Sequence, residues 1–235
     1  MKYVSLAVLS LAVILSACSS LPPVAQIALD KATIQKQAVK IGIVSKKPPK
    51  ISVIFPGAGC LLCIAVASGA HSELSAHVKT LESDVPDLDN MLFDKLKAQG
   101  LDVTLISEEF DLSDASKIDV DKEQLYAARR DFRPFAKQYG LTHIVFMSIG
   151  HHGVIRDYSS YVPTSAPYAS VSGVAYMIDL STNQYVWHNT IDNKLSATGQ
   201  WKTPPAYPEL TNAYYSVVES TKESVLEAFD FEKVK

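Results

Sequence analysis

One run of nine residues, Leu141–Ile149, constrains the fold of this chain more than any other segment. Its sequence, LTHIVFMSI, is nearly continuous in apolar residues. A strand that alternates apolar and polar residues can leave one face in water, whereas a continuous apolar run needs cover on both faces. The run therefore predicts a sheet strand with other elements packed above and below it.

Further strands and helices are expected on either side of this run. Two short β-rich segments precede it and a hairpin follows it, with Asn183 in the turn because asparagine tolerates the left-handed conformation that such a turn requires. The expected strands are Ile51–Phe55, Leu101–Ile106, Ser170–Asp179 and Gln184–Asp192. Apolar residues at helical spacing predict helices near 74–81 and over 84–100, 122–139 (restarted or kinked at Pro134) and 208–229.

The order of these elements defines the fold class. Two strand–helix–strand crossovers followed by a hairpin give an α/β (α+β) fold: a mixed β-sheet of about five strands with helices packed on it. The acidic stretch 107–121 is expected to be a solvated loop.

The first residues have the pattern of an export signal. Lys2 precedes an apolar run from Val4 to Leu15, which is followed by small residues. This is typical of a secretory signal peptide, and the run is too short for a stable membrane span. We therefore expect residues 1–17 to be a signal peptide.

The four residues after this run, Leu15-Ser16-Ala17-Cys18, resemble the bacterial lipobox. The resemblance implies that Cys18 receives a diacylglyceryl group on its sulfur and, after cleavage, an N-acyl chain such as palmitate. The protein would then be held on the membrane by acyl chains. Ser19, where an aspartate usually favours the inner membrane, implies an outer-membrane lipoprotein whose domain faces the periplasm. An ordinary signal peptide with a cysteine at its cleavage site is the alternative.

The remaining chain divides into two parts. Residues 18–49 hold Pro22-Pro23 and Pro48-Pro49 around a weak helical pattern, and they are predicted to be the lipidated N-terminus and a tether. Residues 50–235 are predicted to be a single α/β periplasmic domain. Apolar residues make up 47% of the chain, which is enough to fill a core of that size.

The composition excludes some function classes. The net charge is −3, and removal of residues 1–17 takes away only Lys2, which leaves −3 − 1 = −4. Without a basic stripe, nucleic acid is not an expected partner. Nucleophile-elbow, phosphate-loop and zinc-protease motifs are missing from the sequence, so we expect no enzyme activity, no cofactor and no metal.

Cys60 and Cys63 leave three alternatives open. The periplasm favours a disulfide, which would be a structural link across a short loop. A redox-active pair would need a strand, a loop and a helix N-terminus in that order, which Ile51–Phe55 and Pro56-Gly57 offer, although Leu61-Leu62 is an unusual insert. Two small buried thiols are the third alternative. Zinc would require a second cysteine pair.

A polar, aromatic segment from Gly150 to Tyr168 is predicted to be a long loop that binds a partner. Its candidate residues are His151, His152, Arg156, Tyr158, Tyr161 and Tyr168. Loops of this length are commonly functional, and tyrosine gives a large contact area at low entropy cost. Aromatic residues folded onto the sheet are the alternative. The two adjacent histidines would point to opposite faces of an extended chain, which argues against a shared metal.

Three stretches resemble a group of outer-membrane lipoproteins with a small α/β domain: Leu92…Leu96…Gly100-Leu-Asp-Val103, Phe135-Ala136…Gly140-Leu-Thr-His-Ile-Val145 and Met177-Ile-Asp-Leu…Tyr185-Val-Trp187. The group includes the N-terminal domain of TolB, the curli-secretion lipoprotein and the penicillin-binding-protein activators. The resemblance implies an accessory or assembly factor for an envelope complex. A self-associating scaffold subunit and a thiol-redox protein using Cys60 and Cys63 are the alternatives.

Overall fold

The computed structural model describes residues 23–36, 38–108, 110–121 and 123–231 of the chain. The predicted signal peptide, the predicted lipobox with Cys18, and Ser19 lie outside the described residues. The predictions made for these positions therefore stay predictions.

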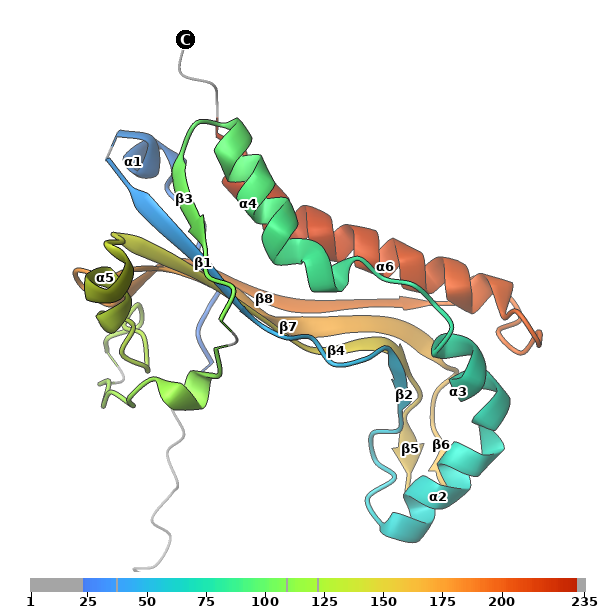
Figure 1. Ribbon diagram of the computed structural model, residues 1–235. Helices are drawn as coiled ribbons and strands as arrows, with labels where there is room; N and C mark the ends of the chain where they lie inside the picture. The colour runs from blue at the N-terminus through green and yellow to red at the C-terminus, as the bar shows by residue number, and fades with distance from the viewer. Residues whose placement is uncertain (1–22, 37, 109, 122, 232–235) are drawn as a thin grey trace, which may run out of the picture.

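A mixed sheet forms the centre of the molecule (Figure 1). Neighbouring strands lie in the order β3-β1-β4-β7-β8, and β2 pairs with β4 outside this path. β1 runs parallel to β3 and β4, whereas β4, β7 and β8 are antiparallel. The bounds are β1 Lys40–Lys46, β2 Ser52–Ile54, β3 Asp102–Leu105, β4 His143–Ile155, β7 Tyr168–Asp179 and β8 Gln184–Ser196. The predicted fold class is confirmed.

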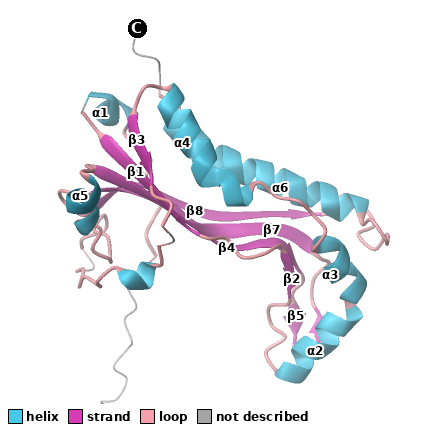
Figure 2. Ribbon diagram, viewed as in Figure 1, coloured by secondary structure: helices cyan, strands magenta, loops and turns pink. Residues whose placement is uncertain are grey.

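Helices and loops cover both faces of this sheet (Figure 2). Helices α4 (Leu88–Ala98) and α6 (Pro208–Leu226) pack on one face, where Val145 and Met147 point into the main apolar cluster. Helix α5 (Pro134–Tyr139) and the segment before it cover the other face, where Ile144 and Phe146 lie in a second cluster. The apolar run Leu141–Ile149 thus has the cover on both faces that its sequence predicts.

Several local predictions are confirmed. Leu88, Leu92 and Leu96 form the buried face of α4, which follows the short 3-10 helix η1 (Val85–Asp87). Asn183 has a positive φ of 58° in the β7–β8 turn. Helix α6 continues into η3 (Glu227–Phe229) and matches the helix predicted for 208–229. Among its described residues, the acidic stretch holds one short turn of helix, η2 (Leu112–Asp114).

The predicted tether over 18–49 is wrong for its second half. Residues Lys40–Lys46 form β1, which lies inside the sheet between β3 and β4, and Ile41, Ile43 and Val44 are fully buried. Helix α1 (Lys31–Lys36) precedes it, and Ile27 pairs with His188. The proline pairs therefore bracket a folded segment, and Pro48-Pro49 separates β1 from β2 along one edge of β4.

The helix predicted for 122–139 exists only as α5. The residues before Pro134 are irregular because Asn183 holds them in place. Its side chain accepts a hydrogen bond from the Phe132 amide at 3.0 Å and donates to the carbonyls of Ala128 and Arg130 at 3.4 and 2.9 Å. These bonds from a distant turn replace the bonds that a helix would make.

A smaller group of elements gathers where the second half of β4 extends beyond β1. It contains β2, α2 (Leu61–Ala70), α3 (Ser72–Val78) and the small hairpin of β5 (Tyr158–Ser159) and β6 (Val162–Pro163). Figure 1 shows these elements at the opposite end of the sheet from α1 and α5. This lobe carries the candidate site.

Candidate functional site

The turn after β2 is pressed against the small hairpin. The Tyr158 amide donates to the Pro56 carbonyl at 2.8 Å, and the Ser160 amide donates to the Gly57 carbonyl at 3.1 Å. Gly57 has a φ of +83°, and a β-carbon at this position would lie 1.8 Å from the Tyr158 carbonyl oxygen. Only glycine satisfies both constraints. The turn thereby fixes where the next residues, including Cys60, begin helix α2.

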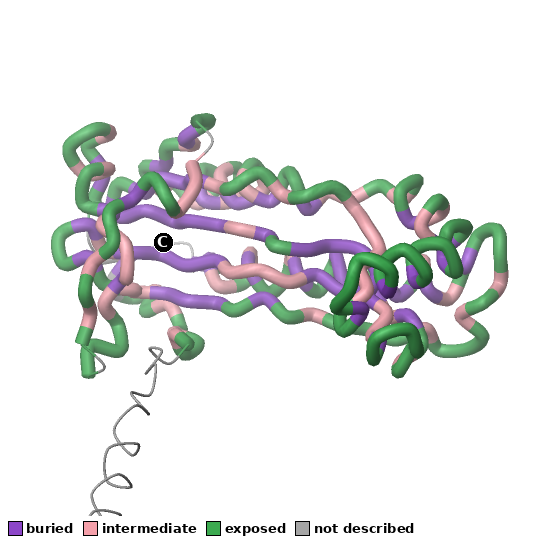
Figure 3. Tube along the Cα trace, turned by 90° about the horizontal axis from the view of Figure 1, so that it is seen from below, coloured by how far each residue is buried: buried purple, intermediate pink, exposed green. Residues whose placement is uncertain are grey.

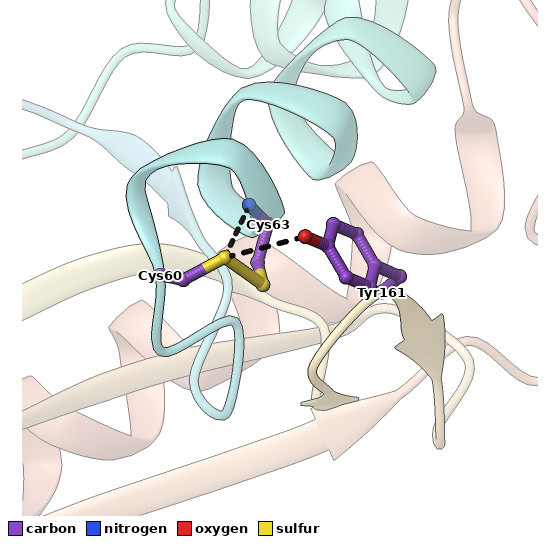
Figure 4. The surroundings of a disulfide bond; sticks show 3 residues. All are labelled: Cys60, Cys63 and Tyr161. Carbon is purple, nitrogen blue, oxygen red and sulfur yellow. Dashed lines mark hydrogen bonds between the residues drawn. A yellow bond between two sulfur atoms is a disulfide. The ribbon is translucent and has the colours of Figure 1, made fainter.

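A disulfide joins Cys60 and Cys63 at the start of α2 (Figure 4). Cys60 is the N-cap residue, and its sulfur accepts a hydrogen bond from the Cys63 amide at 3.0 Å. The Tyr161 hydroxyl lies 3.7 Å from the same sulfur, and because a disulfide sulfur has no proton, the hydroxyl is the donor. Cys60 is exposed, whereas Cys63 is buried beneath it.

Helix α2 exposes most of its apolar side chains. Its sequence, LLCIAVASGA, contains no charged residue, and within it only Cys63 and Ala67 are buried. The β5–β6 hairpin adds two more exposed apolar residues, of which Tyr161 lies beside the disulfide. We call this set the apolar surface; its members are Leu61, Leu62, Ile64, Val66, Tyr161 and Val162. Figure 3 shows α2 as a largely exposed helix at the right-hand end of the molecule.

The sequence carries one signal for this surface, which is a run of ten residues without a charge. The apolar residues Ile64–Ala67 would ordinarily be expected inside the fold, because apolar residues are usually buried. A helix of ten residues without a single charge cannot bury all sides against one hairpin, however. Exposed aliphatic side chains gathered in one place are the exception that marks interaction sites.

The loop predicted for Gly150–Tyr168 is wrong over its first part. β4 continues to Ile155, and β2 and β7 pair with it on both sides. Gly153 permits this pairing, since a β-carbon there would lie 2.1 Å from the Ser52 carbonyl oxygen. His151 and His152 are consequently buried strand residues and do not form a free binding loop.

His152 is held inside the fold by two bonds. Its Nε2 lies 2.6 Å from the Pro49 carbonyl oxygen and must donate to it, so Nδ1 accepts from the Tyr214 hydroxyl at 3.3 Å. Burial is the main cause that lowers the pKa of His152. Burial, followed by the neighbouring His152, lowers the pKa of His151 to about 4. Both rings are therefore neutral at pH 7.

The other four predicted binding residues are divided among three environments. Tyr161 belongs to the apolar surface. Tyr158 is buried, and its hydroxyl lies 2.8 Å from Nε2 of His71, which Arg156 also contacts. Tyr168 is half-buried and donates to Asp157 at 3.3 Å. The structure thus brings Arg156 and Tyr158 together with His71, a residue that the sequence pattern did not single out.

Two further observations concern metals and membranes. Among the residues that the structure describes, no group of three or more His, Cys, Asp or Glu side chains is placed to hold a metal ion. In the same residues, no helix is long and apolar enough to cross a membrane.

Comparisons with known proteins give structural similarities alone. No protein-family model matches the chain, and no curated protein sequence matches it. A PelC dodecamer from Paraburkholderia phytofirmans is 12% identical with a TM-score of 0.34, covering 88% of this chain and 95% of that one. Protein XCC0632 from Xanthomonas campestris is 13% identical with a TM-score of 0.34, covering 88% and 89%. Lipoprotein GNA1162 from Neisseria meningitidis is 11% identical with a TM-score of 0.26, covering 77% and 99%. These values are too low to transfer a function.

Proposed function

We propose that this chain is a lipid-anchored lipoprotein of the cell envelope that acts, without catalysis, as an accessory or assembly factor for an envelope protein complex. The apolar surface is the observation that carries the docking role. Helix α2 is already formed and capped by the disulfide, so its exposed side chains are presented in a fixed arrangement. Such a helix suits a groove on a partner protein.

The energy available from this surface is sufficient for docking. Full burial of a Leu, Ile or Val side chain is worth about 1.5–3 kcal/mol relative to its exposed state. Leu61 and Leu62 are the most exposed members of the surface. A partner that covers them together with Ile64 and Val66 gains several such contributions, which offset the loss of translational freedom.

The anchor is proposed from the sequence alone. The lipobox resemblance supports acylation of Cys18, and Ser19 supports an outer-membrane position with the domain in the periplasm. Labelling cells with a clickable fatty acid tests this part: Cys18→Ser should lose the label. Equal labelling of the variant and the native protein would contradict the anchor without affecting the docking surface.

The docking role is tested with two leucines of equal exposure. Leu62 in α2 and Leu125 in the segment before α5 are both 63% exposed. We expect Leu62→Asp to weaken capture of the partner from a crosslinked envelope about tenfold or more. Leu125→Asp, which adds the same charge at the other end of the molecule, should leave capture unchanged. If both variants capture normally, the apolar surface is not the docking site.

The same variants distinguish an envelope partner from two other binding partners, a second copy of this chain and a lipid bilayer. If Leu62→Asp changes the molar mass measured by light scattering from an oligomer to a monomer, the partner is a second copy and the chain is a scaffold subunit. If it instead abolishes binding of Cys18→Ser protein to lipid vesicles, the surface contacts the bilayer. Both results would replace the proposed envelope partner.

A second candidate function, thiol–disulfide exchange, is favoured by one observation. Cys60, the N-cap residue of α2, is exposed, while Cys63 is buried. A partner thiolate could attack Cys60, form a mixed disulfide and release Cys63 as a thiolate; a second partner thiol would then release Cys60 and leave the partner oxidised. The amide contact at Cys60 would stabilise its thiolate.

The reduction potential distinguishes this candidate from a structural link. Equilibration with glutathione buffers should place a structural disulfide below about −300 mV, whereas an exchanging pair lies well above that value. A potential below this limit removes the exchange function. It leaves the docking proposal intact, since the apolar surface does not require a reactive sulfur.

A further inference from the structure

A cavity beside the apolar surface has no role in the proposed docking. It lies where the end of α2 meets the start of α3, and it is closed by Arg156 after β4 and by the segment 201–207 before α6. Its volume is about 430 Å³, and its lining includes His71, Glu73, Arg156, Trp201, Lys202 and Tyr207. Cavities of about 300–1,000 Å³ are typical of small-molecule sites.

The guanidinium of Arg156 is fixed in this cavity. Its Nε donates to the Ser165 carbonyl at 3.1 Å, and its Nη1 donates to Nε2 of His71 at 2.9 Å. The guanidinium carbon also lies 5.0 Å from the centroid of the Trp201 ring. Three contacts from separate segments hold the group in one orientation, so binding a ligand would cost little rotamer entropy.

The positive charge of this cavity comes from Arg156 and Lys202. Within the described part of the chain, no carboxylate lies within ion-pair distance of Arg156 or Lys202. Glu73 is the only acidic residue in the lining. A partly buried guanidinium is normally paired, because desolvation without a counter-charge is costly.

His71 does not add to this charge. Arg156 can only donate, so Nε2 of His71 is an acceptor and its proton lies on Nδ1. Burial lowers the pKa of His71, and the charges of Arg156 and Lys202 lower that pKa further. The ring is thus a neutral acceptor that orients Arg156 and leaves Nη2 without a hydrogen-bond partner among the described residues.

We propose that this cavity binds a small ligand through an oxyanion, a phosphate or a carboxylate, held by Arg156 and Lys202. The planar donor fork of arginine matches both groups, and lysine adds a point charge. The aromatic rings of Trp201 and Tyr207 line the cavity and would contact the rest of the ligand. The oxyanion could belong to a free molecule or to the headgroup of an anionic lipid.

Calorimetric titration of the full-length chain with inorganic phosphate and with acetate tests the free-ligand source. Vesicles of phosphatidylglycerol, compared with phosphatidylcholine, test the headgroup source, with Cys18→Ser protein so that acyl chains do not drive binding. In either arm, Arg156→Gln and Lys202→Gln should each weaken binding about tenfold or more. Lys137→Gln, which removes an exposed lysine from α5, should bind as the native chain does.

A second readout does not depend on affinity. A bound anion would counter the positive charges beside His71, so the pKa of His71 measured by NMR should rise when the effective ligand is added. Lys202 is exposed, and its variant should fold even if Arg156→Gln does not. The proposal is overturned if neither arm binds, or if Lys202→Gln and Lys137→Gln bind equally well.

Discussion

The Trp187 ring in β8 meets the Phe229 ring in η3 edge to face, with 4.8 Å between their centroids. Both residues are buried in the main core cluster. This contact ties η3, which continues α6, to the antiparallel side of the sheet.

Removal of the indole should therefore be costly. We expect Trp187→Ala to lower the free energy of unfolding by about 3–5 kcal/mol in urea denaturation, the usual cost of a large cavity in a core. Tyr215→Ala on the exposed side of α6 is the matched control and should cost less than about 1 kcal/mol. A similar small loss for Trp187→Ala would show that the core tolerates the cavity.

Stability should decrease as the pH falls from 7 to 5. The pKa of His151 is lowered to about 4 and that of His152 is also lowered, so the unfolded chain binds protons that the folded chain does not. The free energy of unfolding should fall by up to about 1.4 kcal/mol per pH unit for each such histidine once the pH drops below the ordinary histidine value. Urea denaturation at pH 7, 6 and 5 measures the slope. A stability that stays constant or rises toward pH 5 would contradict the burial of these rings.

Two glycines of one turn should respond differently to alanine. At Gly57 a β-carbon meets the Tyr158 carbonyl and the φ is positive, whereas at Gly59 nothing lies within 4 Å of the added carbon. We expect Gly57→Ala to cost about 1–3 kcal/mol and to speed hydrogen exchange in α2. Gly59→Ala should change stability by no more than about 0.5 kcal/mol. Equal effects would mean that the turn is not held against β5.

Replacement of the two tyrosines of the small hairpin should also change stability by different amounts. Tyr158 is buried and packs edge-on against the rings of Phe55 and His71, whereas Tyr161 is exposed. Tyr158→Ala should cost about 3 kcal/mol or more, and Tyr161→Ala should leave the melting temperature within a few degrees. Differential scanning fluorimetry of the two variants measures the change in melting temperature. A larger decrease for Tyr161→Ala than for Tyr158→Ala would show that Tyr161, and not Tyr158, belongs to the core.

The sequence was informative wherever a local pattern decided the structure. The leucines of α4 recur at helical spacing, and the β7–β8 turn contains Asn183, so both elements could be predicted. β1 could not be predicted in this way, because prolines on both sides are typical of a linker and its burial comes from pairing with β3 and β4. The irregular segment before α5 was mistaken for a helix because the bonds from Asn183 come from a position fifty residues away.

The candidate site was harder to predict for a related reason. Glycines and adjacent histidines suggested that the chain leaves the sheet at Gly150, yet Gly153 is what allows β2 to approach β4. The exposure of α2 depends on how few elements surround it in the finished fold. The contact of Arg156 with His71 joins residues 85 positions apart, which no local pattern in one sequence can indicate.

The length of β4 sets a fixed spacing between two ends of the molecule. Ile27 pairs with His188, which aligns with Tyr176 and through it with Phe146, while the apolar surface begins beyond Ile155. At about 3.4 Å per residue, the strand between these points measures about 30 Å. If the chain is anchored through Cys18, this strand acts as a rigid spacer. It holds α2 at a set distance from Ile27, where the N-terminal segment first pairs with the sheet.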